Sequence, residues 1–172
     1  LFKGKRKVVA SDFVYSFNRI VDPNIASPGA WIFNLVERKN NKYSFFSPND
    51  STLIIQLQKP FSPFLGLLSM PYSFVVAKEI VEHYGQDYRK NPVGTGPFYF
   101  KYWKEGVKLV LRKNNHYFEK DENGNPLPYL EAVSISFIID KQSVFLEFVK
   151  GNIDFISGID PNYKDEILTR QG

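Results

Sequence analysis

Residues 91–98 read Asn-Pro-Val-Gly-Thr-Gly-Pro-Phe, and this stretch separates two kinds of sequence pattern. Before it, apolar residues recur mainly at helical spacing, whereas after it they mostly alternate as in strands. Two glycines and two prolines within eight residues are typical of a connecting segment. We therefore predict two parts of the molecule, residues 1–90 and residues 91–172.

The Gly94-Thr95-Gly96 sequence begins like a dinucleotide-binding loop. The third glycine of that loop is missing, and a strand pattern follows where the loop needs the start of a helix. The pattern therefore favours a conformational role for Gly94 and Gly96 over nucleotide binding.

Before this stretch, the clearest signal is an apolar stripe at helical spacing that begins near Ser11 and Asp12 and ends at Asp22-Pro23. Turn residues and prolines divide the rest into short segments. The predicted elements are a helix at 10–21, a short helix at 30–36, a hairpin of 42–47 with 51–58, a short helix at 61–68, a strand at 74–76 and a helix at 77–84.

After the stretch, apolar and polar residues alternate in pairs of segments joined by turns, and a helical pattern returns near residue 141. The order of elements predicts an α/β fold with mixed α+β character, in which sheets are flanked by helices. The predicted elements are strands at 98–103, 107–112 and 133–139, a polar loop at 119–128, a helix at 141–150, a strand at 153–156 and a helix at 161–170.

Composition excludes several classes of protein. The chain has 172 residues, 43% hydrophobic and 23% charged, which is typical of a globular protein. It has no cysteine, so disulfides and thiol chemistry are excluded, and no apolar run is long enough to span a membrane. The net charge of +4 is concentrated in Lys3, Lys5, Arg6 and Lys7, so we predict no binding to nucleic acid.

Aromatic residues make up 16% of the chain, which is high. Most Phe residues fall on periodic apolar faces, which favours a role in the core. Aromatic side chains that line a ligand cleft remain the alternative.

The sequence offers little catalytic chemistry. Glu79 and His83 stand four residues apart on a predicted helix, but no third metal ligand accompanies them. Asp121, Asn123 and Asn125 have the spacing of a calcium loop, but Pro126 replaces the glycine that such a loop requires. We predict no metal, no cofactor and no catalytic residue, so the chain is predicted not to be an enzyme. A hydrolase domain and a protein-interaction module are the less favoured alternatives.

Four segments in order resemble the extracellular solute-binding proteins of peptide-type ABC transporters, the family of dipeptide-, oligopeptide- and nickel-binding proteins. They are residues 2–28 (with Val-Val-Ala-Ser-Asp-Phe-Val-Tyr-Ser-Phe at 8–17, Arg19, Asp22-Pro23 and Ala26-Ser27-Pro28), residues 50–61 (Asp-Ser-Thr-Leu-Ile-Ile-Gln-Leu, then Pro60-Phe61), residues 91–118 (Asn-Pro-Val-Gly-Thr-Gly-Pro-Phe, then Leu109, Arg112 and Tyr117-Phe118) and residues 127–154 (Leu-Pro-Tyr-Leu, then Lys-Gly-Asn-Ile-Asp).

The resemblance implies a fragment of a periplasmic-binding-protein type II fold. Residues 1–90 are expected to belong to the small extra lobe of such a protein, and residues 91–172 to its first ligand-clasping lobe. The chain opens with Leu1, without an initiator methionine, so we expect an internal piece of a longer polypeptide.

The same resemblance implies a function for the whole protein. It is expected to be a monomer, periplasmic or anchored to the cell surface as a lipoprotein, that captures peptides between two lobes and delivers them to the permease subunits of an ABC importer. A nickel chelate, an oligosaccharide or another small solute is the alternative ligand.

The resemblance also suggests site residues. Ser27, Pro28, Gly29 and Trp31 are the expected ligand contacts, and Gly94, Thr95 and Gly96 the expected crossover, with either a hinge or a tight turn there. Gly29 departs from the family pattern, because some oligopeptide binders carry a ligand-facing aromatic residue there; Trp31 is expected to reach the same space. Val9 stands where the family pattern has a threonine that caps the first helix, and Phe118 stands where it has a tryptophan.

Overall fold

The computed structural model describes residues 6–158 and 160–163 of the chain. The chain forms two compact units, which divide between Gly96 and Pro97. The division falls inside the Gly/Pro-rich stretch, and each unit is described by itself below. Which lobe of a larger protein each unit represents stays a prediction. No helix among the described residues is long and apolar enough to cross a membrane.

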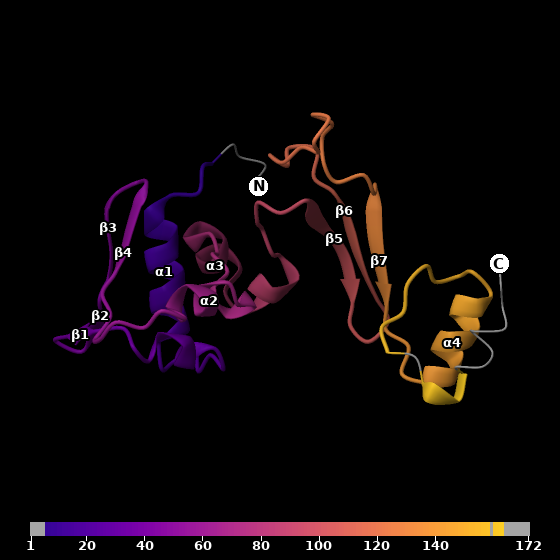
Figure 1. Ribbon diagram of the computed structural model, residues 1–172, viewed down its shortest axis with the longest axis horizontal. Coiled ribbons are helices and arrows are strands. Elements are labelled where there is room, and N and C mark those ends of the chain that lie inside the picture. Colours follow the sequence, from indigo (N-terminus) through magenta and orange to yellow (C-terminus); the bar gives the residue numbers. More distant parts are fainter. Residues whose placement is uncertain (1–5, 159, 164–172) are drawn as a thin grey trace. The chain divides into compact units, whose positions relative to one another are not determined.

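The N-terminal unit is built from short helices and two small hairpins (Figure 1). Its elements are α1 (Ala10–Ile20), η1 (Ala30–Phe33), β1 (Arg38–Lys39), β2 (Lys42–Tyr43), β3 (Phe45–Asn49), β4 (Thr52–Ile55), α2 (Phe64–Leu68), η2 (Pro71–Ser73), α3 (Lys78–Tyr84) and η3 (Gly85–Lys90).

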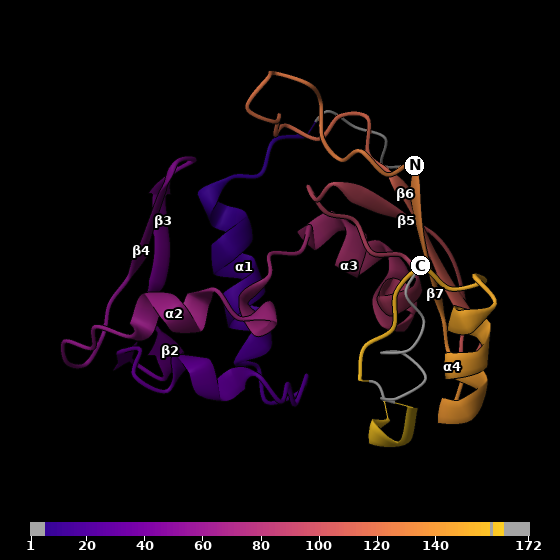
Figure 2. The same ribbon diagram turned by 45° about the vertical axis from the view of Figure 1, so that its right-hand side comes forward.

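Helix α1 lies against the β3–β4 hairpin, as Figures 1 and 2 both show, and its apolar stripe faces the core as predicted. Phe17 is almost fully buried, and its ring packs at an angle on Phe33 and Phe45, with ring centroids 4.8 and 5.5 Å apart. Phe33 and Phe45 also meet edge to face at 5.0 Å. Tilted and edge-to-face rings are favourable arrangements. The predicted use of phenylalanine as core filling is therefore confirmed in this unit.

The hairpin prediction is correct in kind but wrong in its bounds. Strands β3 and β4 pair antiparallel, with a register shift between Phe46 and Asn49. The start of the expected first strand instead belongs to the separate β1–β2 hairpin, which turns at Asn40 and Asn41 with positive φ values of 51° and 62°. Asparagine tolerates this left-handed backbone better than most residues do.

The strand expected at 74–76 is absent. Val76 uses its backbone N–H to donate to the Ser16 hydroxyl of α1, at 2.9 Å, rather than to a neighbouring strand. The helix that follows ends at Gly85 as predicted, where φ is +52°, a backbone conformation that favours glycine.

The C-terminal unit contains a three-stranded sheet and a helix (Figure 1). Its elements are β5 (Phe98–Lys104), β6 (Lys108–Lys113), β7 (Ala132–Ser136), α4 (Lys141–Val149) and η4 (Pro161–Tyr163). All strands pair antiparallel in the order β5-β6-β7, and Gly106 makes the predicted turn with a φ of +67°. The mixed α and β character predicted from the sequence is confirmed.

A bulge in β5 changes which side chains share a face. The register shifts between Phe100 and Tyr102, so Lys101 has no paired residue on β6. Alternation from Phe98 predicts Trp103 on the opposite face from Phe100. The extra residue instead brings Trp103 to the apolar face, opposite Leu109. That face carries Phe98, Phe100, Trp103, Leu109, Leu111, Val133 and Ile135.

Two further expectations concern the end of the chain. Helix α4 forms as predicted, with the Asp140 carboxylate accepting from the Ser143 N–H at 2.7 Å as its N-cap. The strand expected at 153–156 does not form. Residues 161–163 form one short 3₁₀ turn, and the rest of the helix predicted at 161–170 lies outside the described residues.

Candidate functional site

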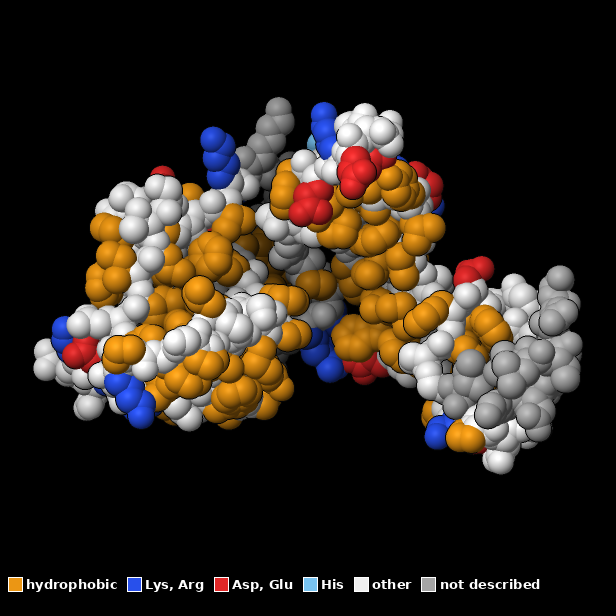
Figure 3. Space-filling model, in the orientation of Figure 1, with side chains coloured by type: hydrophobic (Ala, Val, Ile, Leu, Met, Phe, Trp, Pro, Cys, Tyr) orange, Lys and Arg blue, Asp and Glu red, His pale blue; other side chains and the backbone are white. Residues whose placement is uncertain are grey.

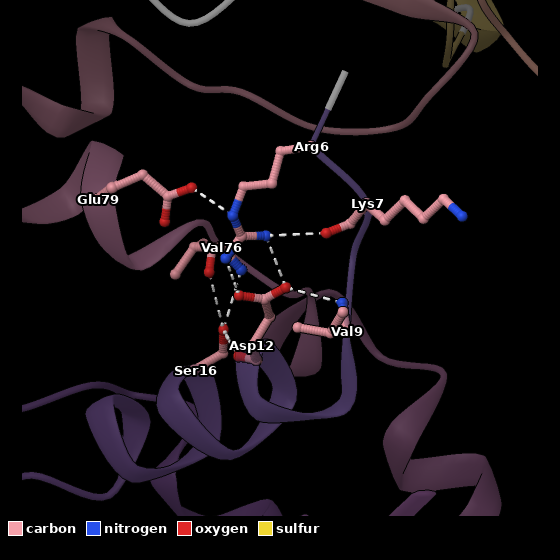
Figure 4. Close-up of polar contacts among 7 residues, drawn as sticks. All are labelled: Arg6, Lys7, Val9, Asp12, Ser16, Val76 and Glu79. Carbon is pink, nitrogen blue, oxygen red and sulfur yellow. Dashed lines mark hydrogen bonds and ion pairs between the residues drawn. The ribbon is translucent and has the colours of Figure 1, made fainter. Parts of the chain in front are cut away.

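A connected polar cluster of the N-terminal unit centres on Asp12, at the start of α1 (Figure 4). Both terminal nitrogens of Arg6 donate to its carboxylate, at 2.8 and 2.5 Å, as a two-pronged ion pair. Val9 has no side-chain acceptor for the helix N-terminus. Instead its own N–H donates to Asp12 Oδ2 at 2.9 Å, which is half of a capping box. Asp12 therefore satisfies the backbone N–H of the N-cap residue, while Val9 supplies no side-chain acceptor for the N–H groups of the first turn.

The electrostatics of this cluster keep Asp12 ionised. The hydrogen bonds from Arg6, supported by the Val9 N–H, hold the pKa of the Asp12 carboxyl below its usual value, although burial acts in the opposite direction. The Asp12 side chain is only 5% exposed, whereas that of Arg6 is 44% exposed. The Nε of Arg6 also lies 2.5 Å from Glu79 Oε1 on α3. One arginine thus joins the segment before α1 to two helices.

Ser16 completes the connection between α1 and the segment before α3. Its hydroxyl accepts from the Val76 N–H at 2.9 Å and lies 2.7 Å from the Asp12 carbonyl oxygen, to which it donates. Beside the cluster is a surface hollow of about 450 Å³, lined in part by Tyr15, Lys78 and Glu82. Its acids are paired with cations, so the arrangement suits a structural brace.

The clusters considered as metal sites are arranged differently. Glu79 Oε1 forms an ion pair with Arg6 Nε, at 2.5 Å. Asp121 accepts from the backbone N–H groups of Asn123 and Asn125 at 2.9 and 2.7 Å, and from the Tyr129 hydroxyl at 2.7 Å. A hydrogen bond from the Asn125 side chain, together with these bonds, lowers the pKa of Asp121 to about 2. Within the described residues, no group of three or more His, Cys, Asp or Glu is placed to hold a metal.

Three of the expected ligand residues, Ser27, Pro28 and Gly29, lie in the turn that leads into η1, and Trp31 lies in η1 itself. The Ser27 hydroxyl accepts from the Gly29 N–H at 3.3 Å, and the Ser27 carbonyl oxygen accepts from the Ala30 N–H at 3.2 Å. Pro28 is exposed, Gly29 is buried, and Trp31 is 47% exposed. The structure therefore brings Pro28 and Trp31 to the surface, while Gly29 is covered.

The side chain that covers Gly29 is Tyr72 of η2, which sequence reasoning missed. A Cβ at position 29 would lie 2.5 to 2.6 Å from the Cβ, Cγ and Cδ1 of Tyr72, closer than real Cβ atoms approach other atoms. Tyr72 itself remains 41% exposed. No spacing pattern links residues so distant in the sequence, and the unexplained glycine at position 29 was the only signal.

The residues of the expected crossover are exposed. Gly94, Thr95 and Gly96 lie at the end of the N-terminal unit. A Cβ at Gly94 would meet no atom within 4 Å, and Gly94 has no positive φ. Glycine is therefore not required at position 94 by the conformation described.

Comparison with known proteins gives this geometry a context. Residues 4–172 match the family model described as bacterial extracellular solute-binding proteins, family 5 Middle. The chain is 30% identical to the periplasmic murein peptide-binding protein MppA of Escherichia coli over 94% of its own length. It is 25% identical to the dipeptide-binding protein DppE of Bacillus subtilis over 86% of its length. It spans 31% of the first relative and 28% of the second, so it corresponds to about a third of each.

Solved structures agree with the sequence comparison. The structure of the E. coli murein tripeptide binding protein MppA matches with a TM-score of 0.85 and 27% identity, covering 96% of this chain and 34% of that one. The DppA periplasmic binding protein of Helicobacter pylori, in complex with the peptide STSA, matches with a TM-score of 0.81 and 26% identity, covering 98% and 34%. The predicted fold, a fragment of a periplasmic-binding-protein type II fold, is confirmed, as is the extracytoplasmic location of the full-length protein. The chain belongs to family 5 of the bacterial extracellular solute-binding proteins.

Proposed function

We propose that the full-length protein is the substrate-binding component of an ABC importer. In this role it captures peptides in a cleft between two lobes and delivers them to permease subunits in the membrane. One observation carries the proposal. The relative that matches over 94% of this chain is named for a murein peptide, and a structure with a TM-score of 0.81 holds the peptide STSA.

The physical chemistry of the chain suits this function. A peptide backbone is recognised by hydrogen bonds that are the same for every sequence, while roomy apolar surfaces accept different side chains. The N-terminal unit exposes large aromatic groups such as Trp31 and Tyr72. Aromatic surfaces supply contact area without demanding one ligand shape. A ligand favours the closed form by the contacts that it gains there.

The two units take different places in this proposal. We assign residues 1–90 to the small extra lobe and residues 91–172 to the first ligand-clasping lobe. The partners are a peptide and the permease, and the binding protein acts as a monomer. The role is non-covalent capture and release, which needs no catalytic residue.

Mass spectrometry of small molecules that co-purify with the full-length protein tests the proposal. We expect short peptides, released on denaturation and absent from a mock purification. Isothermal titration with the same synthetic peptides then measures their affinity. Recovery of a nickel chelate or an oligosaccharide in stoichiometric amount, with no binding of peptides, would contradict the proposal and favour the alternative ligand.

A further inference from the structure

The polar loop at 119–128 contains the pair Asn123-Gly124, which is the only Asn-Gly pair in the sequence. Residues 122–126 are exposed, and the loop contributes acidic and uncharged polar side chains to the surface (Figure 3). An asparagine side chain is most open to attack by the main chain when glycine follows it, because glycine carries no Cβ to crowd the attacking nitrogen. The pair is therefore a candidate site of covalent modification.

The surroundings of Gly124 leave room for such an attack. A Cβ at position 124 would meet no atom within 4 Å beyond its chain neighbours, and the φ of Gly124 is +83°. Glycine adopts this left-handed backbone without steric cost and changes conformation more freely than any other residue. The glycine can therefore turn its nitrogen toward the side chain of Asn123 once the loop opens.

Hydrogen bonds within the loop oppose that opening. The Gly124 N–H, whose nitrogen would attack, donates to the Asp121 carbonyl oxygen at 3.0 Å. The Asp121 carboxylate accepts from the N–H groups of Asn123 and Asn125, at 2.9 and 2.7 Å. It also accepts from the Tyr129 hydroxyl at 2.7 Å. Exposed loops open locally at a low cost in free energy. The Gly124 nitrogen is therefore free to react only while this turn is open.

We propose that Asn123 is a site of deamidation and that the hydrogen bonds of Asp121 set its rate. The Gly124 nitrogen bonds to Cγ of Asn123, the Cγ–Nδ2 bond breaks, and Nδ2 leaves as ammonia with the proton of the Gly124 N–H. Water then opens the resulting succinimide ring at either carbonyl carbon, giving its hydroxyl to the carbon and its other proton to the nitrogen. The product is aspartate or isoaspartate at position 123. Water is the only co-reactant, and no group is oxidised or reduced.

Either product changes the loop in which it forms. The new carboxylate at position 123 lies next to Glu122 and close to Asp121 in the sequence, so it adds repulsion between like charges. Isoaspartate also lengthens the main chain by one carbon, which is expected to displace the Asn125 N–H from the Asp121 carboxylate. The modification is therefore expected to loosen the turn that slows it.

Peptide mapping by mass spectrometry of the full-length protein, incubated at neutral pH, tests the inference. Asn125 is an internal control on the same tryptic peptide, because Pro126 has no N–H and its nitrogen cannot attack. Asn24 is a second reference, because it is exposed and is followed by the branched residue Ile25. We expect aspartate and isoaspartate to accumulate at Asn123, and neither to accumulate at Asn125 or Asn24 over the same time.

Variants of the loop test what sets the rate. Asp121→Ala removes the carboxylate that accepts these hydrogen bonds, and is expected to speed the conversion of Asn123 about 5-fold. Glu122→Gln is the matched control, because it removes one negative charge from the adjacent exposed residue. It is expected to change the rate less than about 2-fold, since exposed charges are screened by salt. Tyr129→Phe removes a single bond to Asp121 and is expected to speed the conversion less than Asp121→Ala does.

Circular dichroism confirms that each variant is folded, and Tyr129→Phe carries the test if Asp121→Ala does not fold. Conversion of Asn123 no faster than that of Asn24 would overturn the assignment of the site. Equal rates in the wild type and in the folded variants of Asp121 and Tyr129 would overturn the role of the hydrogen bonds. Neither result bears on the proposed capture of peptides.

Discussion

Arg6 holds the carboxylate of Asp12 with both terminal nitrogens, at 2.8 and 2.5 Å, and so joins the segment before α1 to the first turn of that helix. The same guanidinium reaches Glu79 on α3. The Asp12 side chain is nearly buried, whereas the Arg6 side chain is about half exposed. The pair is therefore shielded from water on the side of the carboxylate but not on the side of the guanidinium. Removing one partner of such a pair destabilises the fold, because the other partner is left without its hydrogen bonds.

Asp12→Asn is expected to destabilise the full-length protein. The amide of asparagine has nearly the same shape as the carboxylate, but one of its oxygens is replaced by an NH₂ group, which is a donor. That group would face Arg6 or the Val9 N–H, which are themselves donors. A lost buried acceptor of this kind costs about 1–3 kcal/mol. Thermal unfolding of the ligand-free protein measures the effect. Glu82→Gln is the control, because its pair with Lys78 is exposed and worth no more than about 1 kcal/mol. Equal effects of the two substitutions would contradict the bracing role of Asp12.

The contribution of Asp12 to stability is expected to depend on pH. Its pKa in the folded protein lies below its ordinary value, so the unfolded chain takes up the proton first as the pH falls. The stabilisation is therefore complete at neutral pH and is lost as the pH falls through the folded pKa. Urea unfolding between pH 7 and pH 3 is expected to show the wild type approaching Asp12→Asn in stability at the acid end. A constant difference over this range would contradict the expectation.

Ser16→Ala is expected to loosen the contact between α1 and the segment before α3. The substitution removes the acceptor of the Val76 N–H and leaves that partly buried donor unpaired, at a cost of about 1 kcal/mol. Amide hydrogen exchange at Val76 reports the change directly and is expected to accelerate. Ser11→Ala, on an exposed position of the same helix, serves as the control and is expected to leave the exchange rate unchanged.

Gly29→Ala tests the close contact with Tyr72 through stability alone. The added Cβ would lie 2.5 Å from the ring, so Tyr72 must move, and overpacking of this kind costs about 1–3 kcal/mol. In the background of Tyr72→Gly, which removes the Cβ as well as the ring, the close contact is gone, so Gly29→Ala is expected to cost much less. A double-mutant cycle from thermal unfolding measures the coupling between the two positions. Additive effects would show that the two residues do not meet.

Asp121 is expected to order the polar loop at 119–128. Its carboxyl pKa of about 2 means that the carboxylate and its hydrogen bonds persist at neutral pH and weaken only in strong acid. Carbon-detected NMR titration of the side chain is expected to give a midpoint near this value. Asp121→Ala is expected to speed amide exchange at Asn123 and Asn125, whose N–H groups it binds. Glu122→Gln, on the adjacent exposed residue, is the control and is expected to leave both amides protected.

Gly94 and Gly96 are expected to form either a hinge or a tight turn, and substitution by alanine distinguishes the two roles. Gly94→Ala is expected to change stability by less than about 1 kcal/mol, because a Cβ there meets open space. A hinge role would appear only in motion, so Gly94→Ala combined with Gly96→Ala is expected to reduce closure on peptide addition. Small-angle scattering of the full-length protein measures closure with and without peptide. Unchanged closure in the double variant would remove the hinge and favour a simple turn.

Local pattern determined most of the regular elements. The stripe from Phe13 to Val21 specifies α1, and the alternation on either side of Gly106 specifies β5 and β6. Both signals lie within a few residues of the structures that they produce, and burial of one face enforces them. The family resemblance also lay in the sequence itself, because four short segments keep their order over nearly the whole chain.

The tertiary structure decided what depends on distant parts of the chain meeting. The strand expected at 74–76 was displaced by a bond from Val76 to Ser16, and a single inserted residue in β5 moved Trp103 to the opposite face from that expected. Position 29 carries a glycine because Tyr72 occupies its side-chain space. Periodicity reports which face of an element is buried, but not which residue of another element will cover it, because that choice is made by packing across the whole unit.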